Sequence, residues 1–354
     1  MRVLIATGIS EPDIGGPATY AANLSQKWPD GNAKVIAFSR QGGRILSRLY
    51  FLLRVFNASE NFDLIYTLDW FAAGLPAALA AKIRGIPYVV RVGGDYLWER
   101  HIASGEKPVT LNEFYEQKFY KKHPLIHGII RWILQGAAHV IFNTDKQREL
   151  YRACFGLKSE RISTIYNPVP DTAFIHSEKV STRKEFVYWG RFVAGKNLET
   201  LVRAFRKAGI TGYTLTLIGN GPCREQLASL VSKLGVEESV TIEQAMSREE
   251  VWNHVKDSRA LVLPSWTDIS PNVVYEALAL QLPALVTKEN YLSIRDQLSA
   301  TIDPNSVDDI AEKLKMLADD SRYASFADAF RSIRFEQSWD DVVRAHETLF
   351  QQLV

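Results

Sequence analysis

Two cations stand close together on one loop of the sequence. The strand-like run EFVYW leads directly into GRFVAGKN, so that Arg191 and Lys196 follow Gly190 beyond the end of the strand. Doubly wound sheets bind their ligands at the carboxyl ends of strands. A guanidinium that forms bidentate bonds and an ammonium point charge would stabilise the negative charge that develops on a diphosphate leaving group. The alternative interpretation is an ordinary surface loop that carries one Arg and one Lys.

Two carboxylates lie within SWTDISPNVVYEALAL, where seven residues separate Asp268 from Glu276. The SPN between them predicts a helix start, with Ser270 as the cap, Pro271 at the first helical position and Asn272 after it. Backbone N–H groups and the positive end of the helix dipole favour phosphate or sugar hydroxyls at such a place. Both carboxylates can accept hydrogen bonds from the hydroxyls of one bound ligand. A capped surface helix with an incidental glutamate is the alternative.

Two glycines follow another predicted strand, in LTLIGNGP, where Gly219 and Gly221 precede a helix. Glycine allows close approach of the backbone to a neighbour. The run lacks a full GxGxxG pattern, so a tight turn from strand to helix is favoured over direct contact with a ligand.

The elements that must position these residues alternate between strand and helix. This alternation predicts an α/β protein with two doubly wound, parallel-sheet (Rossmann-like) domains. The predicted strands are RVLIAT, AKVIAF, FDLIYT, PYVVRV, AHVIF and RISTIY in the first half and EFVYWG, YTLTLIG, SVTIE, RALVLP and LPALVT in the second.

A connector and a final helix set the predicted boundaries. The segment YNPVPDTAFIHSEKVSTRKE carries two prolines and many polar residues, which is typical of a linker. The last segment places Val342, His346 and Phe350 at helical spacing. We therefore expect domains over residues 1–172 and 173–335, followed by a helix within residues 336–354.

Length and composition are those of a globular protein with more than one core. The chain has 354 residues, of which 46% are hydrophobic and 23% are charged. MRVLIAT resembles a buried strand rather than a signal peptide, and no apolar run approaches about 18 residues, so a cytoplasmic location is predicted. Cys154 and Cys223 lie too far apart in sequence to suggest a disulfide framework or a zinc site.

Charge is divided unevenly along the chain. Residues 1–170 carry 21 Lys and Arg against 14 Asp and Glu, a net charge of +7, whereas the remaining residues carry 21 against 26, a net charge of −5. A basic half favours anionic acceptors or an anionic membrane surface, and a chance distribution of solvated charges is the alternative.

One segment of this basic half has an amphipathic pattern. RILSRLYFLLRVF places Arg44, Ser47, Arg48 and Arg54 within about a third of a helix circumference. The pattern predicts peripheral contact with an anionic membrane through residues 44–56. A helix packed on its own sheet is the alternative.

The three chemical elements described above, in this order and spacing, resemble the donor domain of the family 4 glycosyltransferases. The resemblance extends over nearly the whole chain. It implies the GT-B architecture, in which two domains face a cleft and the last helix crosses back to the first domain.

The resemblance also implies roles for single residues. The family's GRxxxxK element is matched by Gly190, Arg191 and Lys196, whose cations would hold the donor diphosphate. Its two acidic residues fall on Asp268 and Glu276, with the first acid shorter by one methylene. Glu276 would contact the donor ribose, and Asp268 would lie near a hydroxyl of the transferred sugar.

Two places in the first domain belong to the same resemblance. Gly15 and Gly16 stand ahead of a helix that begins near Pro17, and they would face the diphosphate across the cleft. Many family members have a histidine near the segment PYVVRVGGDYLWER, whereas this sequence has no histidine there until His101. Asp95 is the substitute candidate, able to orient or deprotonate an acceptor hydroxyl.

The implied activity is that of a retaining, hexosyltransferase-type enzyme. It would move a sugar from a nucleotide sugar, its co-substrate, to a glycan or lipid-linked acceptor in cell-surface polysaccharide or glycolipid synthesis, with no metal or other cofactor. A nucleotide-sugar epimerase of the same fold and a non-catalytic nucleotide-sugar-binding protein are the alternatives. The missing GxGxxG after the first strand disfavours dinucleotide redox chemistry, and the mixed charge disfavours nucleic-acid binding.

Overall fold

Buried strands of apolar residues build two parallel sheets in the computed structural model, which describes residues 1–9, 16–38, 44–170 and 183–354, and only the backbone of residues 44 and 45. The chain divides into two units. The first unit comprises Met1–Trp98, Asn112–Pro168 and Gln337–Val354, and the second comprises Glu99–Leu111 and Val169–Glu336. The predicted boundary at residue 172 lies outside the described residues.

The sheet of the first unit has six parallel strands in the order β2-β1-β3-β4-β5-β6. Its inner strands are buried along their whole length, as expected where helices cover both faces of a parallel sheet. The strands are β1 (Val3–Thr7), β2 (Ala33–Ala37), β3 (Leu64–Thr67), β4 (Tyr88–Val92), β5 (His139–Phe142) and β6 (Ile162–Thr164).

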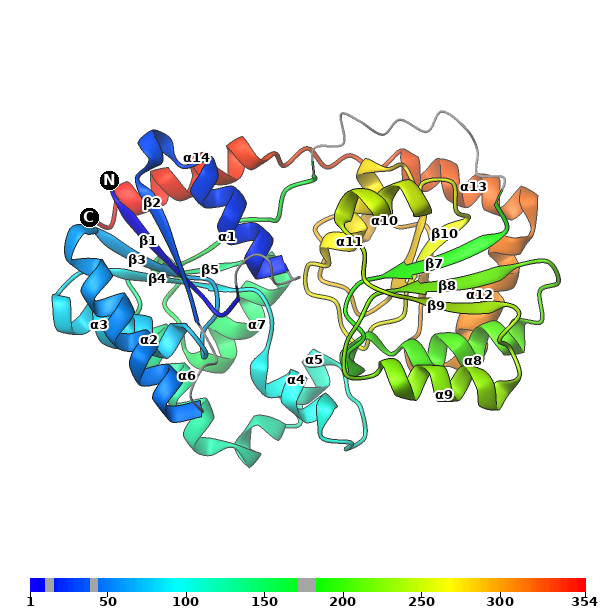
Figure 1. The fold of residues 1–354 in the computed structure, drawn as a ribbon, viewed down its shortest axis with the longest axis horizontal. Coiled ribbons are helices and arrows are strands. Elements are labelled where there is room, and N and C mark those ends of the chain that lie inside the picture. The colour runs from blue at the N-terminus through cyan, green and yellow to red at the C-terminus, as the bar shows by residue number, and fades with distance from the viewer. Residues whose placement is uncertain (10–15, 39–43, 171–182) are drawn as a thin grey trace. The chain divides into compact units, whose positions relative to one another are not determined.

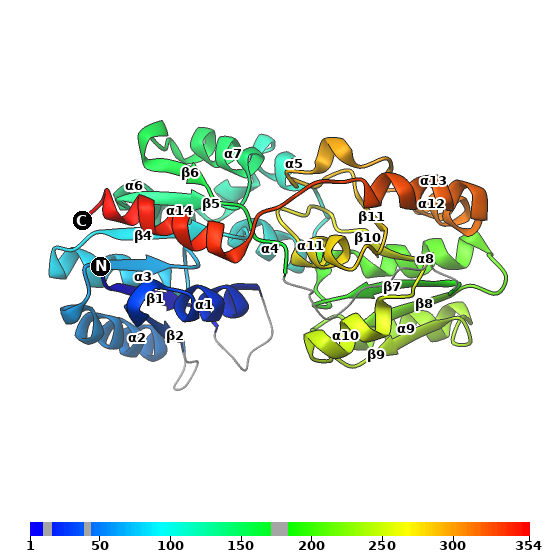
Figure 2. The same cartoon turned by 90° about the horizontal axis from the view of Figure 1, so that it is seen from above.

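Helices lie on both faces of this sheet (Figure 1, Figure 2). On one face lie α1 (Gly16–Gln26) and α14 (Trp339–Gln351), which contact each other. On the other face lie α2 (Arg44–Ala58), α3 (Gly74–Arg84), α6 (Pro124–Gly136) and α7 (Asp145–Phe155), and the short helices α4 (Tyr96–Ala103) and α5 (Leu111–Glu116) stand between β4 and α6 in the chain.

Helix α14 belongs to the core of the first unit. Ser338 and Asp341 form a capping box at its start. His346 is fully buried, its Nε2 lies 2.9 Å from the hydroxyl of Tyr66, and its Nδ1 donates to the carbonyl oxygen of Val342 at 2.7 Å. The helical spacing in the last segment of the sequence therefore marks the face that packs on this sheet.

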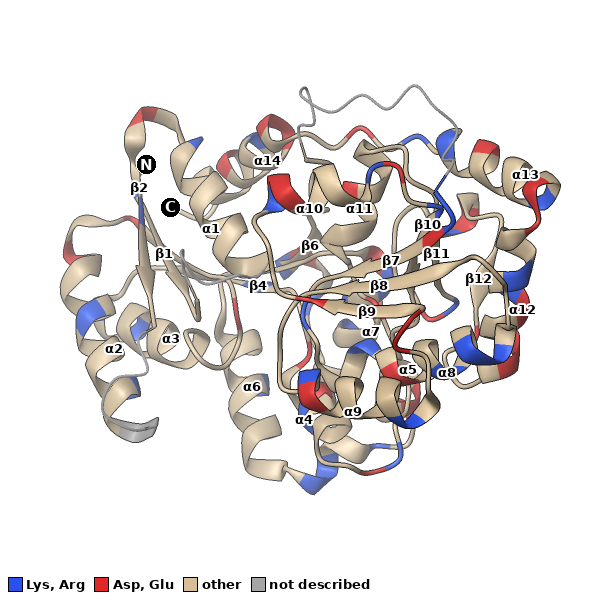
Figure 3. Ribbon diagram, turned by 45° about the vertical axis from the view of Figure 1, so that its right-hand side comes forward, with Lys and Arg blue, Asp and Glu red and all other residues tan. Residues whose placement is uncertain are grey.

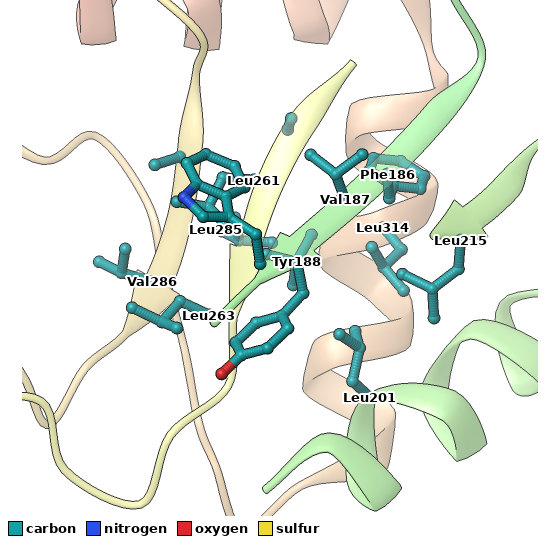
Figure 4. Close-up of a cluster of buried hydrophobic side chains, with 14 of the residues drawn as sticks. Phe186, Val187, Tyr188, Leu201, Leu215, Leu261, Leu263, Leu285, Val286 and Leu314 are labelled. Atoms are coloured by element: carbon teal, nitrogen blue, oxygen red, sulfur yellow. The ribbon is translucent and has the colours of Figure 1, made fainter. Parts of the chain in front are cut away.

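The second sheet repeats the arrangement, with the order β12-β11-β10-β7-β8-β9 and all strands parallel. Its core joins both faces, and Figure 4 shows Tyr188, Leu263 and Val286 within it. The strands are β7 (Glu185–Trp189), β8 (Thr214–Ile218), β9 (Val240–Glu243), β10 (Ala260–Leu263), β11 (Ala284–Thr287) and β12 (Thr301–Ile302), and the helices are α8 (Leu198–Ala208), α9 (Arg224–Leu234), α10 (Arg248–Val255), α11 (Asn272–Ala279), α12 (Val307–Ala318) and α13 (Asp320–Arg331).

The predicted α/β class with two doubly wound parallel sheets is confirmed. In the second sheet the chain runs from β7 outward to β8 and β9, then returns to place β10 on the other side of β7. The reversal of direction lies between β7 and β10, which is where open α/β sheets bind ligands. Over the described residues, every helix is too short or too polar to cross a bilayer.

Candidate active site

The loop beyond β7 is held against the loop beyond β8. The N–H of Gly190 donates to the carbonyl oxygen of Ile218 at 3.0 Å, and the N–H of Phe192 donates to that of Asn220 at 2.9 Å. A short 3-10 turn over Ala194–Lys196 then brings the lysine to the start of α8. The β7 loop is therefore fixed along most of its length.

Gly219 and Gly221 make this close approach possible. A Cβ atom on Gly219 would lie 1.9 Å from the carbonyl oxygen of Gly190, and one on Gly221 would lie 2.4 Å from that of Phe192. Their φ angles of 152° and 155° also disfavour any side chain. These contacts support the structural interpretation of both glycines, and their contact with a ligand stays a prediction.

Lys196 and Asp268 meet at the switch point between β7 and β10. The Nζ of Lys196 lies 2.6 Å from Oδ1 of Asp268, whose side chain is 4% exposed. The backbone of Asp268 is fixed on both sides, because its N–H donates to Glu289 and its carbonyl oxygen accepts from Tyr291. Oδ2 is buried and accepts no hydrogen bond from any described residue. This oxygen is a rigidly held, unused acceptor.

Glu276 lies on α11, the helix that follows the Asp268 loop. Its carboxylate is buried, and Oε2 accepts a hydrogen bond of 2.7 Å from the indole Nε1 of Trp189, the last residue of β7. Oε1 lies 3.8 Å from Nε of Arg248 on α10. Strand β7 and the loop after it therefore supply a hydrogen-bond donor to each carboxylate. Trp189 donates to Glu276, and Lys196 donates to Asp268.

The start of α11 differs from the prediction. Pro271 is the N-cap, Asn272 is the first helical residue, and no side chain caps the helix. The extended backbone of Pro271, with ψ of 114°, moves the start of the helix one residue later than expected and places Ser270 outside the capping position. The Ser270 hydroxyl is buried and bonds to no described residue.

The side chain of Arg191 is exposed to solvent, whereas its backbone is fixed by a hydrogen bond. The hydroxyl of Tyr188 donates to the carbonyl oxygen of Arg191 at 2.9 Å. Burial, and after it the Asp268 carboxylate, raises the pKa of Tyr188 well above its usual value. The phenol therefore stays protonated and remains a donor to the loop.

Asp95, the candidate of the first unit, lies in a different environment. Oδ1 accepts from the N–H of Trp98 at 2.8 Å, at the start of α4, and Oδ2 accepts from the hydroxyls of Tyr115, at 2.6 Å, and Tyr151. Burial raises the pKa of this carboxyl, and the three hydrogen bonds oppose the rise. These contacts give Asp95 a structural role, and its role on an acceptor stays a prediction.

Comparison with known proteins agrees with this geometry. Residues 23–173 match the family model described as Glycosyltransferase Family 4, and residues 171–332 match the one described as Glycosyl transferases group 1.

The chain belongs to the family 4 glycosyltransferases.

This glycosyltransferase is also similar in sequence to individual proteins. It is 26% identical over 222 residues to an exopolysaccharide phosphotransferase of Streptomyces coelicolor, covering 60% of this chain and 23% of that protein. It is 24% identical over 265 residues to an alpha-D-kanosaminyltransferase of Streptomyces kanamyceticus, covering 70% of this chain and 66% of that protein. The chain thus spans less than two thirds of the length of either relative.

Two solved structures have the same fold. WaaG, a glycosyltransferase involved in lipopolysaccharide biosynthesis, superposes with a TM-score of 0.69 at 14% identity, over 98% of this chain and 99% of that chain. An E. coli trehalose-6-phosphate protein bound with UDP-2-fluoro glucose superposes with a TM-score of 0.70 at 13% identity, over 100% and 99% of the two chains. The predicted GT-B fold is confirmed.

Within the second unit of this glycosyltransferase, the structure brings together the predicted residues Gly190, Lys196, Asp268 and Glu276. Gly16, predicted for the donor loop of the first unit, is the first residue of α1 and is exposed, and Gly15 lies outside the described residues.

Sequence reasoning missed three residues of the site. Trp189 and Tyr188 read as ordinary strand residues, and only the position of Trp189 directly before Gly190 could have suggested its contact with Glu276. Arg248 carries no signal, because α10 reaches Glu276 only through the fold.

Proposed function

We propose that the chain transfers a glycosyl group from a nucleoside-diphosphate sugar to a hydroxyl of a glycan or lipid-linked acceptor, with retention of configuration. The observation that carries this proposal is the Lys196–Asp268 pair at the β7–β10 switch point, with one oxygen of Asp268 unused and Glu276 held nearby on α11. Family membership supports the same reaction. The product would belong to a cell-surface polysaccharide or glycolipid.

The two cations would act on the leaving group. An ammonium has three N–H donors, so Lys196 can keep its bond to Asp268 while it donates to a phosphate oxygen. The exposed guanidinium of Arg191 can form two parallel bonds to the same diphosphate. Stabilising the charge that develops there lowers the barrier to breaking the sugar–phosphate bond.

The two acids would orient the donor. Oδ2 of Asp268 can accept a hydrogen bond from a hydroxyl of the transferred sugar, and Glu276 can accept one from the ribose through Oε1. Because Trp189 already occupies Oε2, Glu276 has a fixed orientation before the donor binds. Such preorganisation reduces the entropy lost on binding.

We further propose that the enzyme is of the hexosyltransferase type and needs no metal, since the two cations supply the neutralising charge. Turnover that persists in EDTA would agree with this, and turnover that EDTA abolishes and Mg²⁺ restores would contradict it. Nuclear magnetic resonance of the glycoside product gives the configuration of its anomeric carbon and so distinguishes retention from inversion.

A lipid-linked acceptor would require work at a membrane. We therefore keep, as part of this proposal, a cytoplasmic location with peripheral contact through residues 44–56. The proposal includes no binding of nucleic acid.

The decisive experiment is calorimetric binding of a panel of nucleoside diphosphates to the wild type, to Arg191→Ala and to the matched control Arg203→Ala, which removes an exposed arginine on α8. We expect one diphosphate to bind the wild type and the control equally and Arg191→Ala at least about tenfold more weakly, as for the loss of a charge-assisted bond. If no nucleotide binds, or if both variants bind as the wild type does, the donor site is wrong.

A further inference from the structure

Exposed apolar side chains gather on three helices of the first unit. Of the eight large hydrophobic residues that are exposed in the described part of the chain, seven lie on α2, α3 and α6, and the eighth is Val354. Soluble surfaces rarely concentrate such residues without a binding role. The seven are Leu46, Leu49, Tyr50, Leu53, Ile83, Leu125 and Trp132, with exposed fractions between 40% and 82%.

Helix α2 has two apolar faces, of which the fold uses one. Phe51 and Val55 are buried against the first unit. Leu46, Leu49, Tyr50 and Leu53 follow the spacing i, i+3, i+4, i+7 and form an exposed stripe. Packing within the unit explains the buried face and leaves the exposed stripe without a function.

The sequence predicted an exposed basic face on α2, formed by Arg44, Ser47, Arg48 and Arg54. The side chains that α2 exposes most are apolar instead. Ser47 is buried, the guanidinium of Arg54 donates to the carbonyl oxygen of Ala37 at 3.2 Å, and that of Arg48 lies 4.7 Å from the ring centre of Phe71. The side chain of Arg44 lies outside the described residues. The outer face of α2 is therefore apolar and flanked by cations.

The three helices form one continuous surface. They lie on the same face of the sheet, and α3 contacts both of the others (Figure 1). Arg84 of α3 donates through Nε and Nη2 to the carbonyl oxygen of Phe56 on α2, at 3.2 and 3.1 Å. Lys82 of α3 lies 4.2 Å from the ring centre of Trp132 on α6. We call this the three-helix surface.

The three helices of this surface carry charge of a single sign. The sequences of α2, α3 and α6 contain six Lys and Arg and no Asp or Glu, and in Figure 3 the ribbons of α2 and α6 carry blue segments. Glu60, in the short 3-10 turn directly after α2, is the exposed acid that flanks α2. Three more lysines, at positions 118, 121 and 122, are exposed directly before α6. Such a surface attracts anions over its whole extent.

We propose that the three-helix surface docks on an anionic lipid bilayer, with its leucines, Tyr50 and Trp132 at the level of the headgroups and acyl chains and its cations on the lipid phosphates. A second copy of the chain fits less well, because a two-fold interface would bring two identical cationic surfaces together. The proposed function already includes membrane contact through residues 44–56, and this inference rests on it for that contact alone. The new part is that α3 and α6 contact the membrane as well.

The test is co-sedimentation of the full chain with vesicles of phosphatidylcholine alone and with vesicles in which about a third of the lipid is phosphatidylglycerol. We expect binding to the anionic vesicles only. Leu53→Glu on α2 and Leu125→Glu on α6 should each weaken it at least about tenfold, whereas Ala228→Glu, an exposed residue of α9 in the second unit, should leave it unchanged.

A second pair of variants tests the charge. Lys82→Gln should weaken binding to the anionic vesicles about fivefold, and Lys233→Gln, an exposed lysine of α9, should not. All five sites of substitution are exposed, and circular dichroism together with nucleoside-diphosphate binding checks that each variant is folded.

The outcomes separate this inference from the proposed function. A wild type that ignores both kinds of vesicle overturns the membrane surface, even if it binds nucleotide. Loss of binding in Leu53→Glu but not in Leu125→Glu reduces the surface to α2 and overturns the three-helix proposal. A wild-type dimer that Leu53→Glu converts to a monomer, with vesicle binding unchanged, shows that the surface joins two copies instead.

Discussion

Asp95 in the first unit and Asp268 in the second are both buried aspartates on loops beyond parallel strands, yet their surroundings differ. Asp95 accepts hydrogen bonds on both oxygens from groups of its own unit. Asp268 bonds Lys196 with one oxygen, and its other oxygen has no hydrogen-bond partner among the described residues. A buried acceptor that the protein does not satisfy costs free energy unless a ligand satisfies it. From this contrast we expect Asp95 to contribute to stability and Asp268 to bind a ligand.

The largest expected effect concerns Lys196, the cation that contacts Asp268 in the second unit. Lys196→Gln should lower kcat for glycosyl transfer by about 10²- to 10³-fold, because a charge that stabilises the leaving group is lost. Release of nucleoside diphosphate from the donor measures the rate. The control is Lys207→Gln, which removes an exposed lysine of α8 that pairs with Asp308 of α12. Equal rates for the two variants would remove Lys196 from the mechanism.

Asp95→Asn should act on stability instead. Replacing the carboxylate weakens two tyrosine hydrogen bonds and the bond to Trp98, and we expect the free energy of unfolding to fall by about 2–3 kcal/mol. Chemical denaturation measures it. The folded variant should keep its kcat within about threefold, whereas Asp268→Asn should show the opposite pattern. A large loss of kcat in folded Asp95→Asn would restore Asp95 as a catalytic candidate.

A smaller effect should appear in the pH dependence of the first unit. Burial, and after it the charge of Arg91, lowers the pKa of His346 from 6.5 to about 3. The unfolded chain therefore binds this proton first. The contribution of the neutral imidazole is complete above about pH 6.5 and is lost as the pH falls toward 3, by up to about 1.4 kcal/mol per pH unit.

The measurement is the free energy of unfolding at pH 7 and pH 5.5 for the wild type and for His346→Gln. His139, whose pKa burial lowers to about 4, adds to the same slope in both proteins, so the difference between them isolates His346. The variant should lose less stability on acidification. Parallel slopes would show that His346 does not titrate differently on folding.

The smallest expected effect concerns Trp189. Trp189→Phe removes the indole donor that orients Glu276 and keeps the aromatic packing, so KM for the donor should rise about three- to tenfold with kcat nearly unchanged. Steady-state kinetics with varied donor measures both constants. Trp252→Phe on α10 is the matched control. A fall in kcat without a change in KM would mean that Trp189 acts in the transition state instead.

The sequence predicted the sheets well because most of their buried strands are continuous apolar runs. It missed β12, since two residues give no periodicity. It also missed α4 and α5, which have eight and six residues. The start of α11 was placed one residue early, because Ser270 and Pro271 fit a common capping pattern that the extended backbone of Pro271 overrides.

The site was predictable where its residues share a loop or a helix. In this way the sequence grouped Arg191 with Lys196 and Asp268 with Glu276. The contact between Lys196 and Asp268, which are 72 positions apart, was not predicted, because it depends on β7 and β10 being neighbours in the sheet. The contacts of Trp189 and Arg248 with Glu276 depend on side-chain packing between separate elements, which no local pattern encodes. The hydrogen bonds that Oδ2 of Asp95 accepts from Tyr115 and Tyr151 depend on packing between separate elements in the same way.

The return of α14 to the first unit has a consequence for the order of folding during synthesis. Residues 169–336, which make up most of the second unit, leave the ribosome before residues 337–354 leave it. Tyr66 and Trp28 of the first sheet remain uncovered until His346 and Phe350 arrive. Although it begins the chain, the first unit is thus the last to be completed, and the nascent protein passes through a stage in which only its later half can have a finished core.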